Sequence, residues 1–200
     1  MTDEQLLHFK RLSEVMRSST TAIELEPFLQ KVVTVASELT DSEAASILEL
    51  DEQSKSLRFL AAPKVHIDAL HSVRVPVNGS MAGWVIREQK PLISPDVSID
   101  DRHFREVDFT LAYKTHTLLA VPLTVRGKAF GVLEVVNKNK AHYTEDDALI
   151  LEMLAVPVAL VIHNINLQRR IEASSTQLSE LDHLKTDFIA ITSNELRTPL

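Results

Sequence analysis

The chain has 200 residues, of which 44% are hydrophobic, 24% charged and 5% aromatic, and its formal net charge is −7. This length favours one domain, or one domain with an extension, around a mainly aliphatic core. The acidic balance argues against binding to nucleic acid, which requires a basic surface, and the absence of cysteine excludes disulfides, cysteine-ligated zinc and thiol catalysis.

The N-terminus has neither the basic nor the apolar region of a signal peptide. The longest apolar stretch covers residues 149–162, is interrupted by Glu152 and Pro157, and is shorter than the roughly 18 residues that predict a membrane-spanning helix. We therefore expect a cytoplasmic protein with no membrane segment.

The N-terminal part of the chain predicts two helices followed by a hairpin. Apolar residues at helical spacing predict one helix over residues 3–18 and a second over 26–39. Two apolar runs, 45–50 and 57–61, are separated by polar residues, a pattern typical of paired antiparallel strands.

The middle of the chain predicts shorter elements. Alternating residues over 73–77 predict a strand, and Ser80 is placed to cap a short helix over 81–88. Residues 92–93 predict a brief strand, and the polar residues 94–116 predict a long loop with a helical turn near Phe104.

The C-terminal part of the chain contains the strongest strand signals. Residues 117–125 and 128–136 predict a hairpin around Arg126-Gly127, and Thr144 predicts the cap of a helix that continues to Leu178. This order of elements predicts an α+β fold, with a mostly antiparallel sheet flanked by helices.

Three groups of residues then resemble the motifs of GAF domains, in the same order and spacing. They are Gly79–Val85 with Lys90–Val97, Val121–Lys138, and Tyr143–Asp147. The resemblance implies a sensory GAF domain over residues 21–165, preceded by an N-terminal helix over 1–20. It also implies a ligand pocket lined by Val75, Met81, Asp96, Phe104, Thr117 and Leu119.

Asn137, Lys138 and Asp147 also resemble part of the signature of cyclic-nucleotide-binding GAF domains. That signature has Phe at the position of Tyr143 and Glu at the position of Ala148, so the match is partial. The resemblance implies a structural salt bridge between the lysine and the aspartate. Cyclic nucleotide therefore stays one candidate ligand.

Other cofactors are less well supported by the sequence. Eight histidines are present without the spacing of a metal site, so we expect no metal, and haem held by one histidine stays a further candidate. GAF-type methionine sulfoxide reductases and covalent bilin sensors require cysteine, and the chain contains none.

The last residues resemble the phosphoacceptor helix of histidine kinases. Ser193–Leu200 follows the family pattern Ser-His-Glu-Leu-Arg-Thr-Pro-Leu except at Asn194, where the histidine is expected. A carboxamide lacks the nucleophilic imidazole nitrogen that Glu195 would assist, so we expect no phosphorylation and no catalytic residue here. Asn194 is either a natural variant or a replacement, and the chain has no glycine-rich ATP loop.

Apolar residues between the two modules have the spacing of a coiled-coil seam. They are Ile171, Leu178, Leu181, Leu184, Phe188 and Ile191. We expect a parallel homodimer through residues 1–18 and 160–200, with 166–200 forming a signalling helix and the start of the phosphoacceptor helix. The hypothesis is the input module of a sensor histidine kinase that acts on a response regulator; the alternative is a ligand-free GAF relay module.

Overall fold

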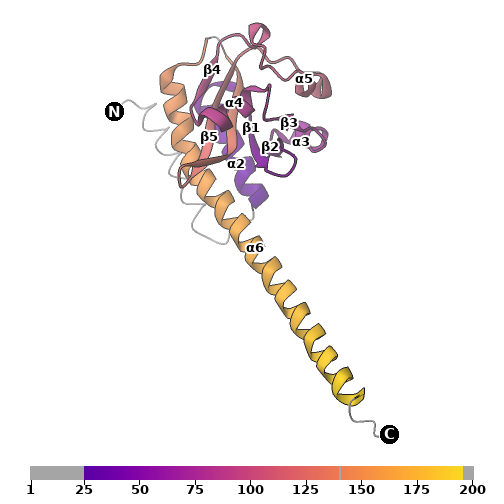
Figure 1. The fold of residues 1–200 in the computed structure, drawn as a ribbon. Coiled ribbons are helices and arrows are strands. Elements are labelled where there is room, and N and C mark those ends of the chain that lie inside the picture. The colour runs from indigo at the N-terminus through magenta and orange to yellow at the C-terminus, as the bar shows by residue number, and fades with distance from the viewer. Residues whose placement is uncertain (1–24, 140, 196–200) are drawn as a thin grey trace. The chain divides into compact units, whose positions relative to one another are not determined.

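The computed structural model describes residues 25–139 and 141–195 and divides into two units, Met1–Val161 and Ile162–Leu200. The helix expected over 3–18 lies outside the described residues, and so does the N-terminal half of the expected dimer contact. The first unit contains the sheet and its covering helices (Figure 1). The described part of the second unit is helical.

The first unit is built on a single antiparallel sheet with the strand order β3-β2-β1-β6-β5-β4. Its strands are β1 (Ser42–Asp51), β2 (Ser56–Ala61), β3 (Val75–Pro76), β4 (Leu92–Ser94), β5 (Leu118–Val125) and β6 (Lys128–Lys138). The two predicted hairpins are confirmed. The strand expected over 73–77 is shorter than predicted, because Pro76 has no amide hydrogen with which to continue the ladder.

The hairpin between β5 and β6 depends on backbone conformations that few residues adopt. Arg126 and Gly127 have φ angles of 53° and 76°, the left-handed pair that a two-residue turn needs to match strand twist. Glycine takes this conformation without steric cost. The turn sets the pairing of Val125 with Lys128, and a bulge between Leu123 and Thr124 then shifts the register to the one in which Leu118 pairs with Val136.

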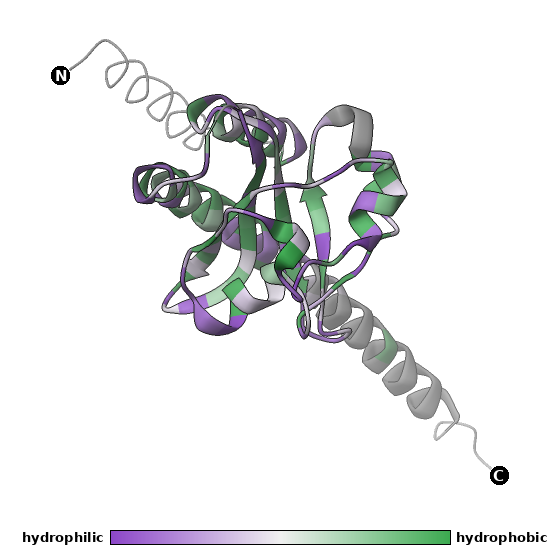
Figure 2. Cartoon of the chain, turned by 90° about the horizontal axis from the view of Figure 1, so that it is seen from above, coloured by the Kyte–Doolittle hydropathy of each residue, from purple (hydrophilic) through white to green (hydrophobic). Residues whose placement is uncertain are grey.

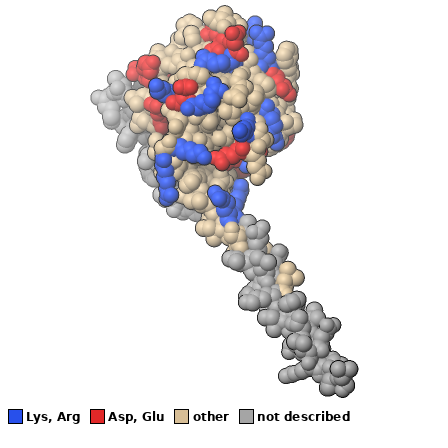
Figure 3. Space-filling view, in the orientation of Figure 1, with Lys and Arg blue, Asp and Glu red and all other residues tan. Residues whose placement is uncertain are grey.

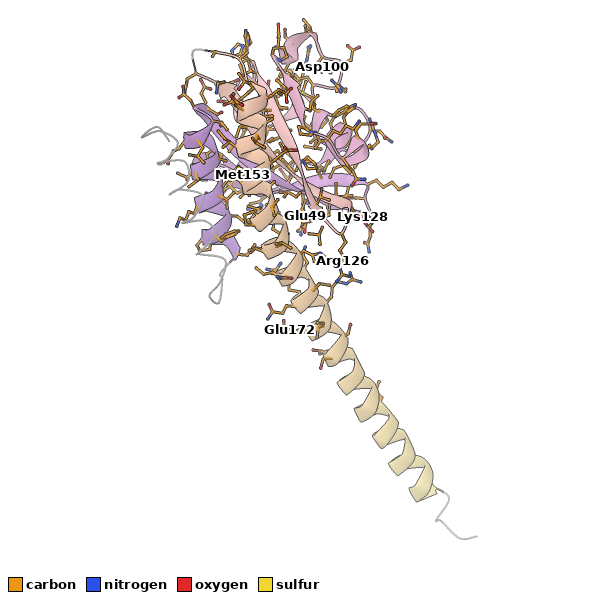
Figure 4. The ribbon with its side chains drawn as sticks, turned by 90° about the vertical axis from the view of Figure 1, so that its left-hand side faces the viewer. Glu49, Asp100, Arg126, Lys128, Met153 and Glu172 are labelled. Atoms are coloured by element: carbon orange, nitrogen blue, oxygen red, sulfur yellow. The ribbon has the colours of Figure 1, made fainter. Side chains whose placement is uncertain are left out.

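Helices cover both faces of the sheet. Helix α2 (Leu25–Leu39) and residues 145–161 of α6 (Glu145–Glu195) lie on one face, and α3 (Lys64–Leu70), α4 (Met81–Glu88) and α5 (Glu106–Leu111) lie on the other (Figures 1 and 4). The strands between them are strongly apolar (Figure 2). Since neighbouring residues of a strand point to opposite faces, β5 and β6 supply both cores.

Helix α4 is held close to the chain that precedes it. Ser80 caps the helix by accepting a hydrogen bond from the amide of Gly83 at 2.9 Å, as the sequence predicts. A Cβ atom on Gly83 would lie 2.0 Å from the carbonyl oxygen of Val77, so only glycine fits this contact. The motif thus brings Met81 and Ala82 into the core.

One short helix was not predicted, and the helical turn expected near Phe104 is found slightly later in the chain, as α5. Residues 64–70 form α3, and the expected loop over 94–116 contains the 3-10 turn Val97–Ile99 and helix α5. Helix α5 has no fully buried residue, and a helix without a buried face does not need regularly spaced apolar residues. Its weak burial explains why the pattern resembled a loop.

Helix α6 begins where the sequence predicts and continues beyond Leu178 to Glu195. Its first part buries one face through Leu151, Leu154 and Val158. Residues 145–176 are long and apolar enough to cross a membrane by length and composition, but 44% of the apolar window is buried within the protein. Partial burial of this kind is also found in core helices.

Candidate functional site

A cavity of about 100 Å³ lies between the sheet and the helices α3, α4 and α5. Strands β1, β2, β5 and β6 form its floor, and the segment from His103 to Leu111 closes it. Side chains on the floor and on the closing segment are mostly apolar. They include Leu48, Phe59, Leu118 and Val136 from the strands, and Phe104, Val107 and Leu111 from the closing segment.

Three of the six residues expected in the pocket line this cavity. Val75 and Met81 are almost fully buried in its wall, and Phe104 belongs to the segment that closes it. The role of these three residues in ligand binding stays a prediction.

The other three residues lie elsewhere. Leu119 is fully buried, but on the opposite face of β5 from Leu118, which does line the cavity. Thr117 accepts a hydrogen bond from the Lys138 amide at 3.0 Å. Asp96 caps the 3-10 turn by accepting from the Ser98 amide at 2.9 Å.

The floor of the cavity contains one carboxylate that the sequence analysis missed. Glu134 lies on β6 directly opposite Ser46 on β1, whose hydroxyl donates to it at 2.8 Å. Burial raises the pKa of Glu134 to about 7, because the charged form has lost most of its water, and the Ser46 hydrogen bond only partly opposes this shift. A charged residue between Val132 and Val136 on an apolar strand face was the available signal.

A second carboxylate, Asp108 on α5, has a different environment. Its two oxygens accept from the Thr115 amide at 3.1 Å and the Thr115 hydroxyl at 2.6 Å. The Nε2 atom of His103 lies 3.1 Å from Oδ2 of Asp108. These contacts connect α5 to the segment that leads into β5, so Asp108 acts as a structural residue of the cavity rim.

Asn137, at the end of β6, joins three segments. Its side-chain oxygen accepts from the His116 amide at 2.7 Å, and its nitrogen donates to Glu43 at 2.8 Å and to the Lys114 carbonyl at 2.9 Å. Its φ of 56° is left-handed, a conformation that asparagine tolerates better than most residues. Hydrogen bonds from Tyr113 and Asn137 hold the pKa of Glu43 below its usual value.

Lys138 continues this connection to helix α6. Its Nζ atom lies 2.7 Å from Oδ1 of Asp147 and donates to the Thr40 carbonyl at 3.0 Å. The other oxygen of Asp147 accepts from the Thr144 amide and hydroxyl, which caps α6. We call Asn137, Lys138, Thr144 and Asp147 the β6–α6 network; its ion pair has the geometry that the resemblance implied.

The described residues form neither a metal site nor a surface patch of one charge on the face that Figure 3 shows. No group of three His, Asp or Glu side chains within that part of the chain converges as metal ligands. Basic and acidic side chains are intermixed on the face shown in Figure 3. The backbone of Asn194 and Glu195 belongs to α6, but their side chains and residues 196–200 lie outside the described part.

Known proteins with similar sequences include two cyclic-nucleotide phosphodiesterases. The chain is 26% identical to a probable 3',5'-cyclic phosphodiesterase, pde-5, of Caenorhabditis elegans over 76% of this chain and 22% of the relative. It is 32% identical to a dual 3',5'-cyclic-AMP and -GMP phosphodiesterase 11A of Takifugu rubripes over 48% of this chain and 11% of the relative. The chain therefore spans less than a quarter of the length of these relatives.

Solved structures share the fold at low sequence identity. The GAF domain of a phosphoenolpyruvate-protein phosphotransferase from Coxiella burnetii superposes with a TM-score of 0.74 at 18% identity, covering 84% of this chain and 99% of that one. A free methionine-R-sulfoxide reductase from Neisseria meningitidis, solved with its substrate, gives 0.66 at 19% identity, covering 82% and 92%. Residues 24–162 match the GAF domain family, and the chain belongs to that family.

Proposed function

We propose that this chain is the sensory input module of a sensor histidine kinase, in which a small molecule in the cavity changes how α6 packs in a homodimer. The observation that carries the proposal is the β6–α6 network, which connects the segment after the cavity rim to the start of α6. Asn137 holds residues 114 and 116, and the adjacent Lys138 holds Asp147.

The closing segment gives the cavity a means of response. Helix α5 contributes Val107, Asp108 and Leu111 to the cavity wall, yet none of its residues is fully buried. Few buried contacts mean a low local stability, which is typical of segments that reposition around ligands. A ligand that orders α5 would act through Thr115 and His116 on Asn137.

The dimer is supported by an exposed apolar stripe on α6. Leu149, Met153, Val156 and Leu160, which we call the α6 stripe, alternate by four and three residues and are each at least half exposed. Met153 is labelled in Figure 4. The same type of spacing continues from Ile171 toward Ile191. A second copy of the chain would cover both parts with one continuous parallel seam.

The kinase assignment rests on the end of the helix. Helix α6 is continuous to Glu195, so it reaches the segment that resembles a phosphoacceptor helix. In an active histidine kinase with this helix, the next steps would be phosphorylation of the histidine and transfer of the phosphoryl group to a response regulator. Asn194 would block the first step in this chain.

The alternative is a ligand-free relay module, and native mass spectrometry of the purified chain separates the two. The proposal expects a dimer that carries a co-purified small molecule. A dimer without any adduct would favour the relay alternative, and a monomer would contradict both.

The relay itself can be tested in a chimera. Residues 1–192 would replace the input domain of an active histidine kinase, joined in register at the Ser193–Leu200 pattern. Deleting one residue from α6 rotates the helix by about 100°, whereas deleting a heptad nearly preserves the face of the seam. We expect the single deletion to change kinase activity and the heptad deletion to leave it near its starting value; equal effects would contradict the relay.

A further inference from the structure

The cavity contains a carboxylate that has no cationic partner among the described residues. The ion pairs of the described residues all involve acids other than Glu134, for example Glu49 with Arg58 and Asp147 with Lys138. Glu134 accepts from the neutral hydroxyl of Ser46. A carboxylate in an apolar setting is costly unless a charge or several hydrogen bonds compensate it.

The apolar surroundings of Glu134 increase the cost of its negative charge. Val132 and Val136 flank it on the same face of β6, and Leu118 and Phe59 line the cavity nearby. Asp108 does not compete for the same partner, because Thr115 and His103 already occupy its oxygens. The free bonding capacity of the cavity is therefore concentrated at one acid.

We propose that the cavity binds a small organic cation, a primary ammonium on a compact apolar body, with the ammonium group against Glu134 and Ser46. The inference rests on the proposed sensory function and names the class of its ligand. An ammonium has three donors, which suit the Glu134 carboxylate and the Ser46 hydroxyl oxygen together. The apolar body would contact the valine, leucine and phenylalanine side chains.

The size of the cavity limits that body. Its volume of about 100 Å³ is smaller than the engineered cavity of about 150 Å³ that holds benzene. A branched chain of about four carbons is of the right order for this space. Larger ligands would require α5 to move outward.

Charge argues against an anionic ligand in the same place. The described residues that line the cavity include Glu134 and Asp108 but neither lysine nor arginine. A phosphate would meet two acids and no lysine or arginine there, and the one histidine, His103, already lies against Asp108, which disfavours a cyclic nucleotide in this conformation. The inference thus differs from what the phosphodiesterase relatives suggest.

Binding of a cation is linked to the ionisation of Glu134. Because burial raises its pKa to about 7, the acid is largely neutral at lower pH and then offers no charge to the ligand. Affinity should therefore rise as pH increases toward 7 and level off above it. The other titratable side chains that line the cavity are His103, Asp108 and Tyr113.

A matched series of four-carbon compounds tests the inference. Isobutylammonium, isobutanol and isobutyrate differ in charge and share a branched body. The probe is the carboxyl carbon resonance of Glu134, followed by NMR in the full chain above and below its pKa. We expect isobutylammonium to bind at least about tenfold more tightly than isobutanol above that pKa, and isobutyrate not to bind.

Two variants complete the test. Glu134→Gln keeps the shape and removes the charge, so it should bind the ammonium and the alcohol about equally; the probe in this case is the amides of neighbouring residues. Glu52→Gln removes a carboxylate that is 68% exposed at a distant turn, and it should behave like the unmodified chain.

Several results would overturn the inference. Equal binding of isobutylammonium and isobutanol to the unmodified chain would remove the role of charge while leaving the cavity as a ligand site. Binding of isobutyrate alone, or of no member of the series, would also overturn it. A co-purified acid in the native mass spectrum would support the sensory function and reject the ammonium class.

Discussion

Two of the three charged side chains of strand β6, Lys138 and Glu134, are in opposite situations. At its end, Lys138 lies against Asp147 and the Thr40 carbonyl, and its ammonium is also 5.6 Å from the ring of Tyr143. In the middle of the strand, Glu134 has a neutral hydroxyl for a partner and an apolar cavity beside it. One charge is compensated by the protein, and the other leaves room for a ligand.

This difference indicates how the domain divides its tasks. The β6–α6 network satisfies its polar groups and fixes the start of α6. The cavity side has a helix without fully buried residues and a buried carboxylate that is costly to ionise, and both reduce stability. In the proposed relay the two regions would be complementary, since the network would connect a responsive cavity to the start of α6.

The largest test of this comparison removes the compensated charge. Lys138→Met leaves the carboxylate of Asp147 buried without its partner and should lower the free energy of unfolding by about 3–5 kcal/mol, measured by urea denaturation. Lys128→Met is the matched control on the same strand. Its pair with Glu52 is 73% and 68% exposed, so the loss should stay within about 0.5 kcal/mol. Similar losses in the two variants would show that the network does not anchor α6.

The second test concerns the uncompensated charge. The folded pKa of Glu134 is raised from 4.5 to about 7, so the folded chain binds more protons than the unfolded chain in this range and loses stability as pH rises through it. Glu134→Gln should remove that loss. Its advantage over the unmodified chain should be on the order of 3 kcal/mol above pH 7 and disappear below pH 4.5. Parallel stability curves across the range would contradict the raised pKa.

The third test separates two roles of Asn137. Asn137→Ala removes the side-chain hydrogen bonds and places alanine at a φ of 56°, which is unfavourable for alanine. We expect the free energy of unfolding to fall by about 2 kcal/mol. Asn137→Gly removes the same hydrogen bonds but adopts that φ freely, so it should be less damaging by about 1 kcal/mol. If glycine were as damaging as alanine, backbone conformation would contribute little. Thermal unfolding of both variants provides the measurement.

The test with the smallest expected effect concerns association of two chains through the exposed face of α6. Val156→Glu places a charge in the α6 stripe, where Val156 is 61% exposed in one chain, and should weaken the dimer at least about tenfold. Ile99→Glu changes a residue that is 80% exposed on the 3-10 turn and should not alter association. Sedimentation equilibrium measures both. An unchanged dimer in the Val156 variant would move the contact away from this stripe.

The sequence predicted the elements with strong periodicity. Strands β5 and β6, helix α2 and the caps at Ser80 and Thr144 follow from local rules that tertiary contacts do not alter. Helix α3 was missed because it is only seven residues long, and α5 was expected only as a helical turn near Phe104 because none of its residues is fully buried. Their positions depend on packing over the cavity, which a local pattern does not encode.

The candidate site was predictable to a smaller extent. Leu118 and Leu119 are adjacent and equally apolar, but only the strand register decides which of them faces the cavity. Asp96 resembled a pocket residue, whereas the structure uses it as a cap. Glu134 could have been noticed as an acid within an apolar strand, but its isolation from cations depends on contacts across the sheet.

Helix α6 also contains Pro157, and this residue affects the mechanics of the helix. A proline has no amide hydrogen and its ring crowds the carbonyl one turn earlier, here that of Met153. The missing backbone hydrogen bond makes α6 easier to bend at this position, which lies beyond the first turns that the β6–α6 network holds. If α6 transmits a change as proposed above, Pro157 is the position at which the helix bends most easily.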